Sequence, residues 1–224
     1  MNRTRHVAIW LGLLLLAVGC TVWGAQPGLT ISDYNPAVGA TVQFAVSYAG
    51  DGAQYAWDFD GDGTYEATTQ QPTVDHVFTT PGFVEISARV TGAGGRVTSW
   101  RRGLLIGSSP LYAIRDANVA ADGTVVVDIT LHSREEVRAP GLEERIPQGW
   151  QLEIVNAGNA VTKRVGNDLQ VLWLNPIEAG DLWTFTYRLH PPYGAGSPTL
   201  SGTVSGYADK RVTATVCGDT IVPN

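Results

Sequence analysis

Residues 55–66 read YAWDFDGDGTYE. Side chains of a β-strand alternate between its two faces, so Trp57 and Phe59 would share one face and Asp58 and Asp60 the other. Two aromatic side chains on one face indicate a buried core, and an acidic turn containing glycine follows directly. The stretch therefore predicts a core strand of a β-sheet protein that leads into an acidic turn.

Alternating apolar residues predict further strands before and after this stretch. Pro36, Gly39 and Pro81-Gly82 supply turns between them, and the glycine-rich residues 92–95 join the last two strands as a hairpin. A β-sandwich over residues 28–106 follows from this pattern. Its predicted strands cover residues 29–31, 41–48, 55–59, 74–78, 83–90 and 97–106.

Two motifs of this region resemble the PKD domain, an immunoglobulin-like β-sandwich found mostly in extracellular and surface proteins. Residues 57–63 are similar to the W-D-F-G-D-G turn of that family, and residues 76–84, HVFTTPGFV, resemble its H-x-[YF]-x-x-x-G stretch. The resemblance implies an immunoglobulin-like fold for residues 28–106. It also implies that His76 is a packing and hydrogen-bonding residue near a strand corner, and it leaves the ligand open.

The loop-type residues 107–110, GSSP, predict a linker, after which the strand pattern resumes. Regular turns predict a second β-sandwich over residues 111–224. A linker of four residues predicts that the two domains sit end to end with limited swing. Residues 135–145 are charged and contain Pro140-Gly141, which predicts a loop that runs into a short edge strand over residues 142–146. A helix over residues 133–137 is the alternative to this loop, but it is too short to stand alone. The predicted strands cover residues 114–119, 124–132, 142–146, 150–155, 168–174, 182–190, 199–207 and 212–222.

The second domain resembles immunoglobulin-like repeats of bacterial and archaeal surface proteins. The resemblance rests on the order of P-x-G-W at residues 147–150, a strand ending in Trp173, an aromatic strand at residues 182–190, a double proline and L-S-G-T at residues 200–203. These motifs imply fold and location only. The predicted fold class is therefore all-β, with two tandem immunoglobulin-like β-sandwiches after a cleaved signal peptide.

The first nineteen residues differ in character from the rest. Arg3 and Arg5 precede an almost wholly apolar run over residues 7–19, which predicts a signal peptide that is too short to span a bilayer. The following Cys20 resembles the lipid-receiving cysteine of a bacterial lipoprotein, with residues 20–27 as a tether. Ordinary cleavage after residues 22–24 is the alternative, so the chain is predicted to be exported as an envelope lipoprotein or as a secreted protein.

The net charge and the two cysteines of the chain limit the classes of partner that the sequence predicts. Removal of the signal changes the formal net charge from −6 to −8, because it takes away Arg3 and Arg5 and no acid. Such a surface repels nucleic acids and anionic membranes, so contact with a membrane is predicted only through a lipid on Cys20. The second cysteine, Cys217, lies in an alternating run and is expected to be a small buried apolar residue, so no intramolecular disulfide is predicted.

The acidic turn carries one metal-binding hypothesis. Asp58, Asp60, Asp62 and Gly63 reproduce the first half of a D-x-D-x-D-G calcium loop, to which Thr64 could add a carbonyl and Glu66 a water-mediated contact. Thr69 occupies the twelfth position, where such loops need a bidentate Glu. The alternative is an acidic β-turn in which the Asp side chains bond nearby backbone N–H groups.

Other polar and aromatic residues predict binding rather than catalysis. Trp100 and Arg102 share a strand face, either as a contact patch or as an Arg stem that covers a half-buried Trp. Adjacent Glu143 and Glu144 point opposite ways, which suits a solvated edge better than a glycosidase pair. A sugar-stacking platform is the alternative to core packing for four tryptophans, Trp57, Trp150, Trp173 and Trp183.

No sequence motif of a nucleophile elbow, zinc helix, Walker loop or dinucleotide fold occurs. We therefore predict a non-catalytic extracellular or envelope protein that mediates protein–protein or adhesive contacts, or serves as a spacer. A carbohydrate-binding accessory module with a polysaccharide partner is the second hypothesis. An enzyme without a recognisable motif is the third.

Overall fold

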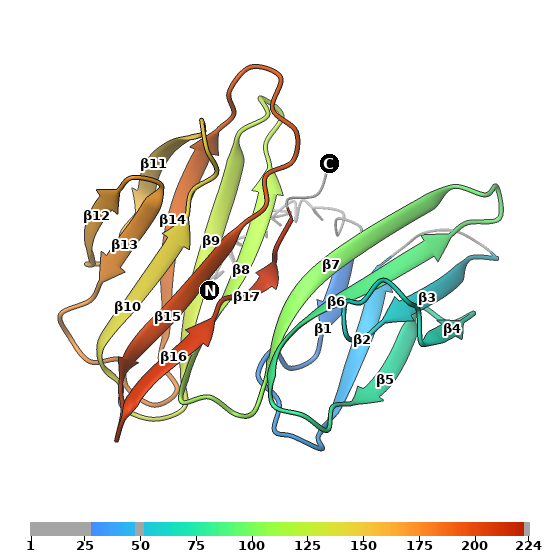
Figure 1. The fold of residues 1–224 in the computed structure, drawn as a ribbon, viewed down its shortest axis with the longest axis horizontal. Coiled ribbons are helices and arrows are strands. Elements are labelled where there is room, and N and C mark those ends of the chain that lie inside the picture. Colours follow the sequence, from blue (N-terminus) through green and yellow to red (C-terminus); the bar gives the residue numbers. More distant parts are fainter. Residues whose placement is uncertain (1–27, 48–51, 222–224) are drawn as a thin grey trace, which may run out of the picture.

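The computed structural model describes residues 28–47 and 52–221, which form strands β1 to β17 and contain no helix. The all-β prediction is confirmed. Within these residues no segment is a helix long and apolar enough to cross a membrane. The predicted signal peptide, Cys20 and the tether lie outside the described residues. Figure 1 shows two sandwiches joined at a common edge.

The first sandwich packs a three-stranded sheet against four strands of a larger sheet. Both sheets are antiparallel within this sandwich, and alternate residues point inward. The three-stranded sheet has the order β1-β2-β5, from Gly28–Ile31, Thr41–Ser47 and Thr73–Val77. The larger sheet contributes β3 (Gln54–Asp58), β4 (Ala67–Thr69), β6 (Gly82–Thr91) and β7 (Val97–Ile106).

The second sandwich has a five-stranded sheet, β12-β13-β10-β15-β16, opposite the strands β11, β14, β9 and β8. The five strands are β12 (Val161–Val165), β13 (Asp168–Leu172), β10 (Arg138–Arg145), β15 (Ser201–Tyr207) and β16 (Arg211–Thr215). The opposite strands are β11 (Gln151–Asn156), β14 (Leu182–His190), β9 (Val125–Ser133) and β8 (Leu111–Val119). Residues 134–136 form a turn, so the competing helix at residues 133–137 is absent.

The last strand, β17 (Cys217–Asp219), joins the two sandwiches. It pairs antiparallel with β7 at Gly103 and Arg102, and parallel with β8 at Ile114 and Arg115. The result is one nine-stranded sheet, β11-β14-β9-β8-β17-β7-β6-β3-β4, that runs through both sandwiches (Figure 1). The expected end-to-end arrangement is therefore wrong, because the sandwiches lie edge to edge.

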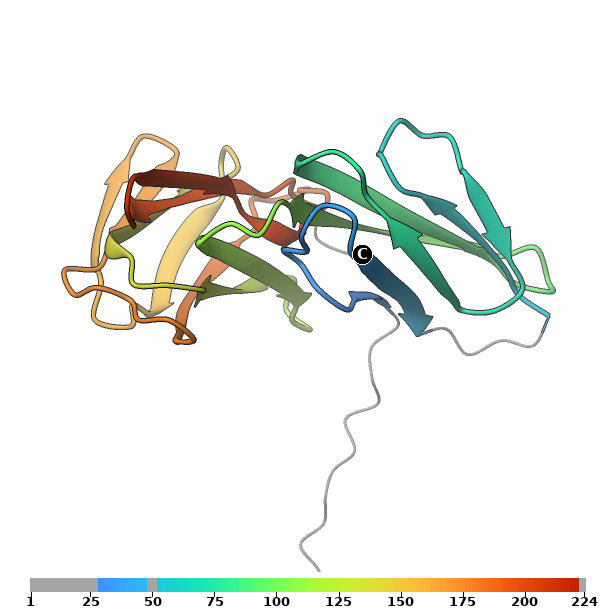
Figure 2. The same cartoon turned by 90° about the horizontal axis from the view of Figure 1, so that it is seen from below.

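The two hydrophobic cores lie on opposite faces of this shared sheet. In β7, Leu104 and Ile106 belong to the first core, whereas Leu105 packs against the second. Since neighbouring residues of a strand point to opposite faces, the small sheet of the first sandwich and the five-stranded sheet of the second cover opposite faces. Figure 2 shows the two sandwiches from below, a view in which this placement on opposite faces can be followed.

Strands β4 and β12 were not predicted, and two predicted strands differ from the structure in more than their end positions. The single strand expected over residues 212–222 ends at Thr215, and the chain crosses at Val216 to the other sheet as β17. The short edge strand expected at residues 142–146 is instead the eight-residue β10, which lies between β13 and β15. A register shift between Arg138 and Gly141 and a positive φ of 47° at Ala139 let β10 begin earlier than its charged sequence indicates.

Candidate functional site

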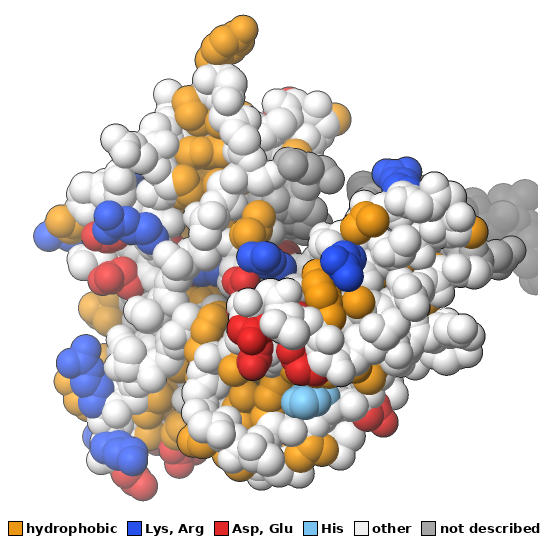
Figure 3. All heavy atoms as spheres, turned by 45° about the vertical axis from the view of Figure 1, so that its right-hand side comes forward, with side chains coloured by type: hydrophobic (Ala, Val, Ile, Leu, Met, Phe, Trp, Pro, Cys, Tyr) orange, Lys and Arg blue, Asp and Glu red, His pale blue; other side chains and the backbone are white. Residues whose placement is uncertain are grey.

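The acidic turn follows β3 and closes over the edge of the first core. One oxygen from each of Asp58, Asp60, Asp62 and Glu66 lies within 4.8 Å of the others. Asp58 is 3% exposed, and the other three side chains are exposed. Figure 3 shows acidic side chains gathered beside a histidine on this face of the molecule. Carboxylate oxygens at this spacing form a donor set that suits a hard cation such as Ca²⁺.

Backbone N–H groups hold all four carboxylates in place, that of Asp60 through Asp62 N–H, which donates to its Oδ1 at 3.2 Å. Asp58 Oδ1 accepts hydrogen bonds from the N–H groups of Asp60 (3.3 Å) and Gly61 (2.7 Å), and its Oδ2 accepts one from Gly63 (3.1 Å). Asp62 Oδ1 accepts a hydrogen bond from Thr64 N–H at 2.6 Å. These local bonds are those expected of the acidic β-turn alternative, and each carboxylate keeps lone pairs for a further ligand.

Glycine lets the turn lie directly on β6. Gly61 has a φ of 75°, and a Cβ at this position would lie 2.8 Å from the carbonyl oxygen of Glu85. Glu66 closes the turn from the other end, since its Oε2 accepts a hydrogen bond from Phe59 N–H at 2.7 Å. The carboxylates are therefore positioned by the turn before any ligand arrives.

The structure brings four of the five predicted ligands together. Glu66 belongs to the cluster through its own carboxylate, whereas the sequence predicted only a water-mediated contact. Thr64 contributes its N–H to Asp62 and is exposed. Thr69, at the twelfth position, accepts a hydrogen bond on Oγ1 from Trp57 Nε1 at 3.0 Å and so supports the core instead.

His76 packs as the family resemblance implies. Its ring stacks on Phe59 with centroids 4.0 Å apart and meets the edge of Phe78 at 4.7 Å. Burial lowers its pKa below the ordinary histidine value, against the opposing field of Glu66. His76 is thus a packing group beside the acidic turn.

The tryptophans do not form a surface platform. Trp57, Trp150 and Trp173 are buried, and Trp183 is partly buried against the second core. Trp173 Nε1 donates to the carbonyl of Gly158 at 3.0 Å, which fixes that ring inside the sandwich. The sugar-stacking interpretation of these four residues is therefore wrong, and their core interpretation is confirmed.

Trp100 and Arg102 do not form an exposed contact patch either. Trp100 packs against the first core. The Arg102 side chain is 14% exposed and lies between the sandwiches, where it pairs with Asp116 and Asp219 and covers the ring of Tyr34. Trp100 is therefore a core residue of the first sandwich, and only Arg102 lies at the domain junction.

A buried ionic group in the second sandwich was missed by sequence reasoning. Arg115 and Glu144 are both fully buried and form two hydrogen bonds, from Arg115 Nη2 to Oε1 (2.5 Å) and from Nε to Oε2 (3.2 Å). Tyr187 donates its hydroxyl to Glu144 Oε2 at 2.9 Å, and burial raises its pKa well above the usual value. The predicted solvated edge is therefore wrong for Glu144, although Glu143 is exposed.

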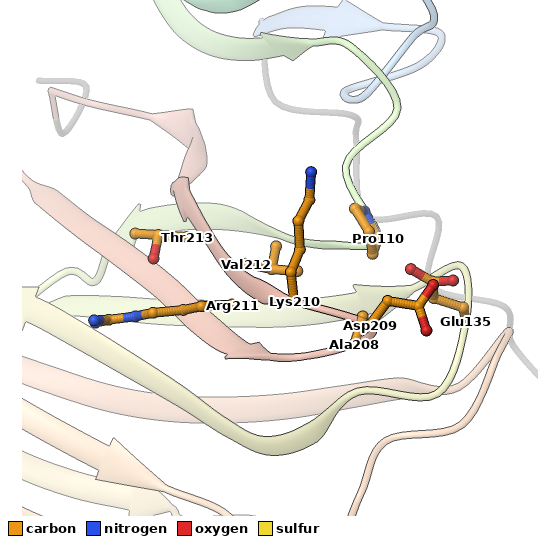
Figure 4. Close-up of a pocket in the computed structure, with 8 residues that line it drawn as sticks. All are labelled: Pro110, Glu135, Ala208, Asp209, Lys210, Arg211, Val212 and Thr213. Atoms are coloured by element: carbon orange, nitrogen blue, oxygen red, sulfur yellow. The ribbon is translucent and has the colours of Figure 1, made fainter.

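Two shallow hollows lie on the second sandwich. The first has a volume of about 300 Å³ and lies between the linker and the turn after β15. Figure 4 shows Glu135 and Asp209 near each other, while Lys210 and Arg211 point in different directions. The second, of about 320 Å³, is on the outer face of the five-stranded sheet over Gly141. Neither hollow is lined by a histidine or a cysteine.

The second hollow has a polar lining. Thr203, Ser205 and Thr213 come from β15 and β16, and Gln170 comes from β13. Gln170 donates an N–H to Glu143 Oε2 at 3.3 Å. Hydroxyl and amide groups at an open sheet face are able to hydrogen-bond a polar ligand.

Comparison with known proteins identifies the first domain. Residues 28–102 match the family model described as the PKD domain, which confirms the resemblance drawn from the two motifs. No curated protein matches the chain.

Among solved structures, the major pilin SpaD from Corynebacterium diphtheriae is similar with 9% identity and a TM-score of 0.41, over 85% of this chain and 64% of that chain. The collagen-binding domain of Erysipelothrix rhusiopathiae surface protein RspB has 10% identity and a TM-score of 0.38, over 86% and 93%. A carbohydrate-binding module of the β-sandwich superfamily has 15% identity and a TM-score of 0.34, over 88% and 96%. These values give no basis for transferring a ligand.

Proposed function

We propose that this chain is an exported, non-catalytic binding and spacing protein of the cell envelope or the extracellular space. The observation that carries the proposal is the shared nine-stranded sheet, because it makes one extended body of two sandwiches, the first of which matches the PKD domain. The two hollows are open, and the one over Gly141 has a polar lining, which suits contact with a surface better than turnover of a small substrate. The first partner class is an envelope or extracellular protein.

The most exposed aromatic side chain gives the protein partner a candidate contact. Tyr193 is fully exposed on the loop after β14, between Pro192 and Gly194. Tyrosine is enriched among residues that dominate protein interfaces, and the preceding Pro191 and Pro192 limit the entropy that this side of the loop loses on binding. A polysaccharide is the second candidate partner, because hydroxyl and amide groups line the hollow over Gly141.

The test is binding of the mature chain to arrays of envelope proteins and of polysaccharides. We expect saturable binding to at least one protein and weaker binding by Tyr193→Ala. Thr203→Ala, on the outer face of β15, is the matched surface control and should bind as well as the unaltered chain. Binding to glycans alone, lost in Thr203→Ala and kept in Tyr193→Ala, would favour the second partner class. Hydrolysis of an arrayed glycan would contradict a non-catalytic role.

We also propose that the acidic turn binds calcium through Asp58, Asp60, Asp62 and Glu66, with Thr64 as a fifth candidate through its carbonyl. The convergence of four carboxylates within 4.8 Å favours a bound cation, since like charges at this spacing repel one another. Calcium would join the two ends of the turn, at β3 and at Glu66. Its role in this protein would be to stabilise the first sandwich.

Calcium at millimolar concentration is expected to raise the melting temperature of the first sandwich by roughly 5 °C or more over that in EGTA, as for an extracellular site of sub-millimolar affinity. The variant Asp62→Asn keeps an oxygen acceptor for Thr64 N–H but removes the charge, so its shift should be much smaller. Magnesium serves as the cation control. Identical melting curves in calcium and EGTA would leave the turn with a structural role only.

We propose further that Cys20 carries a lipid that anchors the chain at the envelope. Metabolic labelling with palmitate is expected to mark the unaltered protein and not Cys20→Ala, and only the unaltered protein should partition with membranes. An unlabelled, soluble wild-type protein in the culture medium would instead support simple secretion, which is the alternative.

A further inference from the structure

The segment Cys217–Thr220 belongs to the junction rather than to either core. Its backbone pairs with β7 on one side and with β8 on the other. Val216, directly before it, is buried in the second core, so the segment leaves that core at a fixed point. The slot that it fills is bounded by one strand of each sandwich.

Polar contacts hold this segment from several elements. The Asp219 carboxylate accepts a hydrogen bond from Ala117 N–H at 2.9 Å and pairs with Arg102. The Asp219 carbonyl accepts one from Arg115 Nη1 at 3.0 Å. The Thr220 hydroxyl donates to Glu85 Oε2 at 2.7 Å. These contacts tie β6, β7 and β8 to one short segment, and so link the two sandwiches.

Only a few residue types fit at each position of the slot. Gly218 has a φ of 83°, and a Cβ there would lie 2.1 Å from the carbonyl oxygen of Arg115 and 2.9 Å from its nitrogen. Glycine is therefore required at the middle position. The position before it faces the carbonyl of Tyr34, which Cys217 Sγ approaches at 3.6 Å, and the position after it must offer an acceptor to Arg102 and Ala117.

The segment buries little apolar surface beyond the Cys217 side chain. Glycine, aspartate and threonine make up the rest, and they hold the segment through hydrogen bonds and an ion pair, each neutral bond contributing only about 0.5–1.5 kcal/mol net. The two cores, in contrast, are built from large apolar side chains such as Trp57, Phe44, Tyr187 and Phe185. Local opening of this segment therefore costs less than unfolding either core.

We propose that Cys217–Thr220 is a latch, a segment that docks between β7 and β8, holds the two sandwiches as one body, and leaves its slot while both cores stay folded. When the latch opens, the backbone edges of β7 and β8 lose their partner. The sandwiches stay connected by the linker at residues 107–110, by Arg134 at the Asn35 carbonyl, by Arg102 at Asp116 and by Leu105 against the second core. The latch thus supplies the backbone pairing that joins β7 to β8. This inference is independent of the partner and of the proposed function.

Cys217 provides a direct measurement of the latch. Its side chain is fully buried, and burial raises the pKa of the thiol to about 12, so the closed latch keeps it protonated and shielded from reagents. In a Cys20→Ala background it is the sole thiol of the chain. Its rate of alkylation therefore reports how often the segment leaves the slot.

Gly218→Ala is expected to raise this alkylation rate about tenfold or more, because modification of a buried thiol follows the population of the locally open state. Gly180→Ala is the matched control: Gly180 has a φ of 85°, but a Cβ there meets nothing within 4 Å. The control should alkylate at the rate of the unaltered chain. Asp219→Asn, which keeps the size of the side chain and removes its charge, should raise the rate by a smaller factor.

Amide hydrogen exchange in the same variants separates latch opening from general unfolding. Protection of β9 and β14 should stay unchanged in Gly218→Ala, and small-angle scattering should show a larger radius of gyration. If alkylation of Cys217 rises only in step with exchange of β9 and β14, the segment is part of the second core and the proposal is overturned. An unchanged rate in both Gly218→Ala and Asp219→Asn would overturn it as well.

Discussion

Replacement of Glu144 by alanine is expected to lower the free energy of unfolding of the second sandwich by about 3–5 kcal/mol, the usual cost of removing one partner of a buried ion pair. The substitution leaves the guanidinium of Arg115 fully buried with no carboxylate beside it. The hydroxyl of Tyr187 also loses its acceptor. Domains are commonly stable by only about 5–15 kcal/mol, so this loss should be visible as a large shift of the urea midpoint.

An exposed ion pair of the same sandwich gives the control. Arg145 and Asp168 lie 2.7 Å apart on the outer face of the five-stranded sheet, with side chains 61% and 34% exposed. Asp168→Ala should cost at most about 1 kcal/mol. The double variant Arg115→Met/Glu144→Leu should lose less stability than Glu144→Ala, because it leaves no unpaired buried charge. Equal losses for Glu144→Ala and Asp168→Ala would refute the argument.

Trp57→Ala is expected to destabilise the first sandwich by about 3–5 kcal/mol. Trp57 is fully buried, stacks beside Tyr55 with ring centroids 6.5 Å apart, and donates its Nε1–H to Thr69. Its removal leaves a large cavity in the first core and takes away the N–H donor of Thr69 Oγ1, whose hydroxyl still donates to the Gln71 carbonyl. Calorimetry should show one transition moved to much lower temperature.

Trp57→Phe is the conservative comparison and should cost less, because most of the ring volume stays. Trp173→Ala in the second core should move the other transition instead. Two transitions that move together in both alanine variants would mean that the sandwiches unfold as one unit, contrary to the two separate cores.

The core of the first sandwich could be read from the sequence because its pattern is local. Trp57 and Phe59 alternate with polar residues, and both are buried as predicted. The acidic turn is also local, since consecutive carboxylates are only two to four positions apart and a tight turn brings them together. Glu66 joined the cluster directly because the turn folds back on Phe59.

The junction could not be predicted in the same way. Residues 212–217 alternate without interruption, so nothing in the pattern marks the crossing at Val216 from one sheet to another. Glu144 lies in a charged stretch, and the residue that makes its burial tolerable, Arg115, is 29 positions away. Contacts between residues so far apart in the sequence depend on tertiary structure, and the alternation of residues along a strand does not predict them.

The placement of the two cores on opposite faces of the shared sheet has a consequence for access. The sheet face that is open in one sandwich is covered in the other, and the uncovered faces look in opposite directions. A single flat surface can therefore meet only one of the uncovered faces at a time. Two such surfaces can be met at once, from two sides, with the molecule between them.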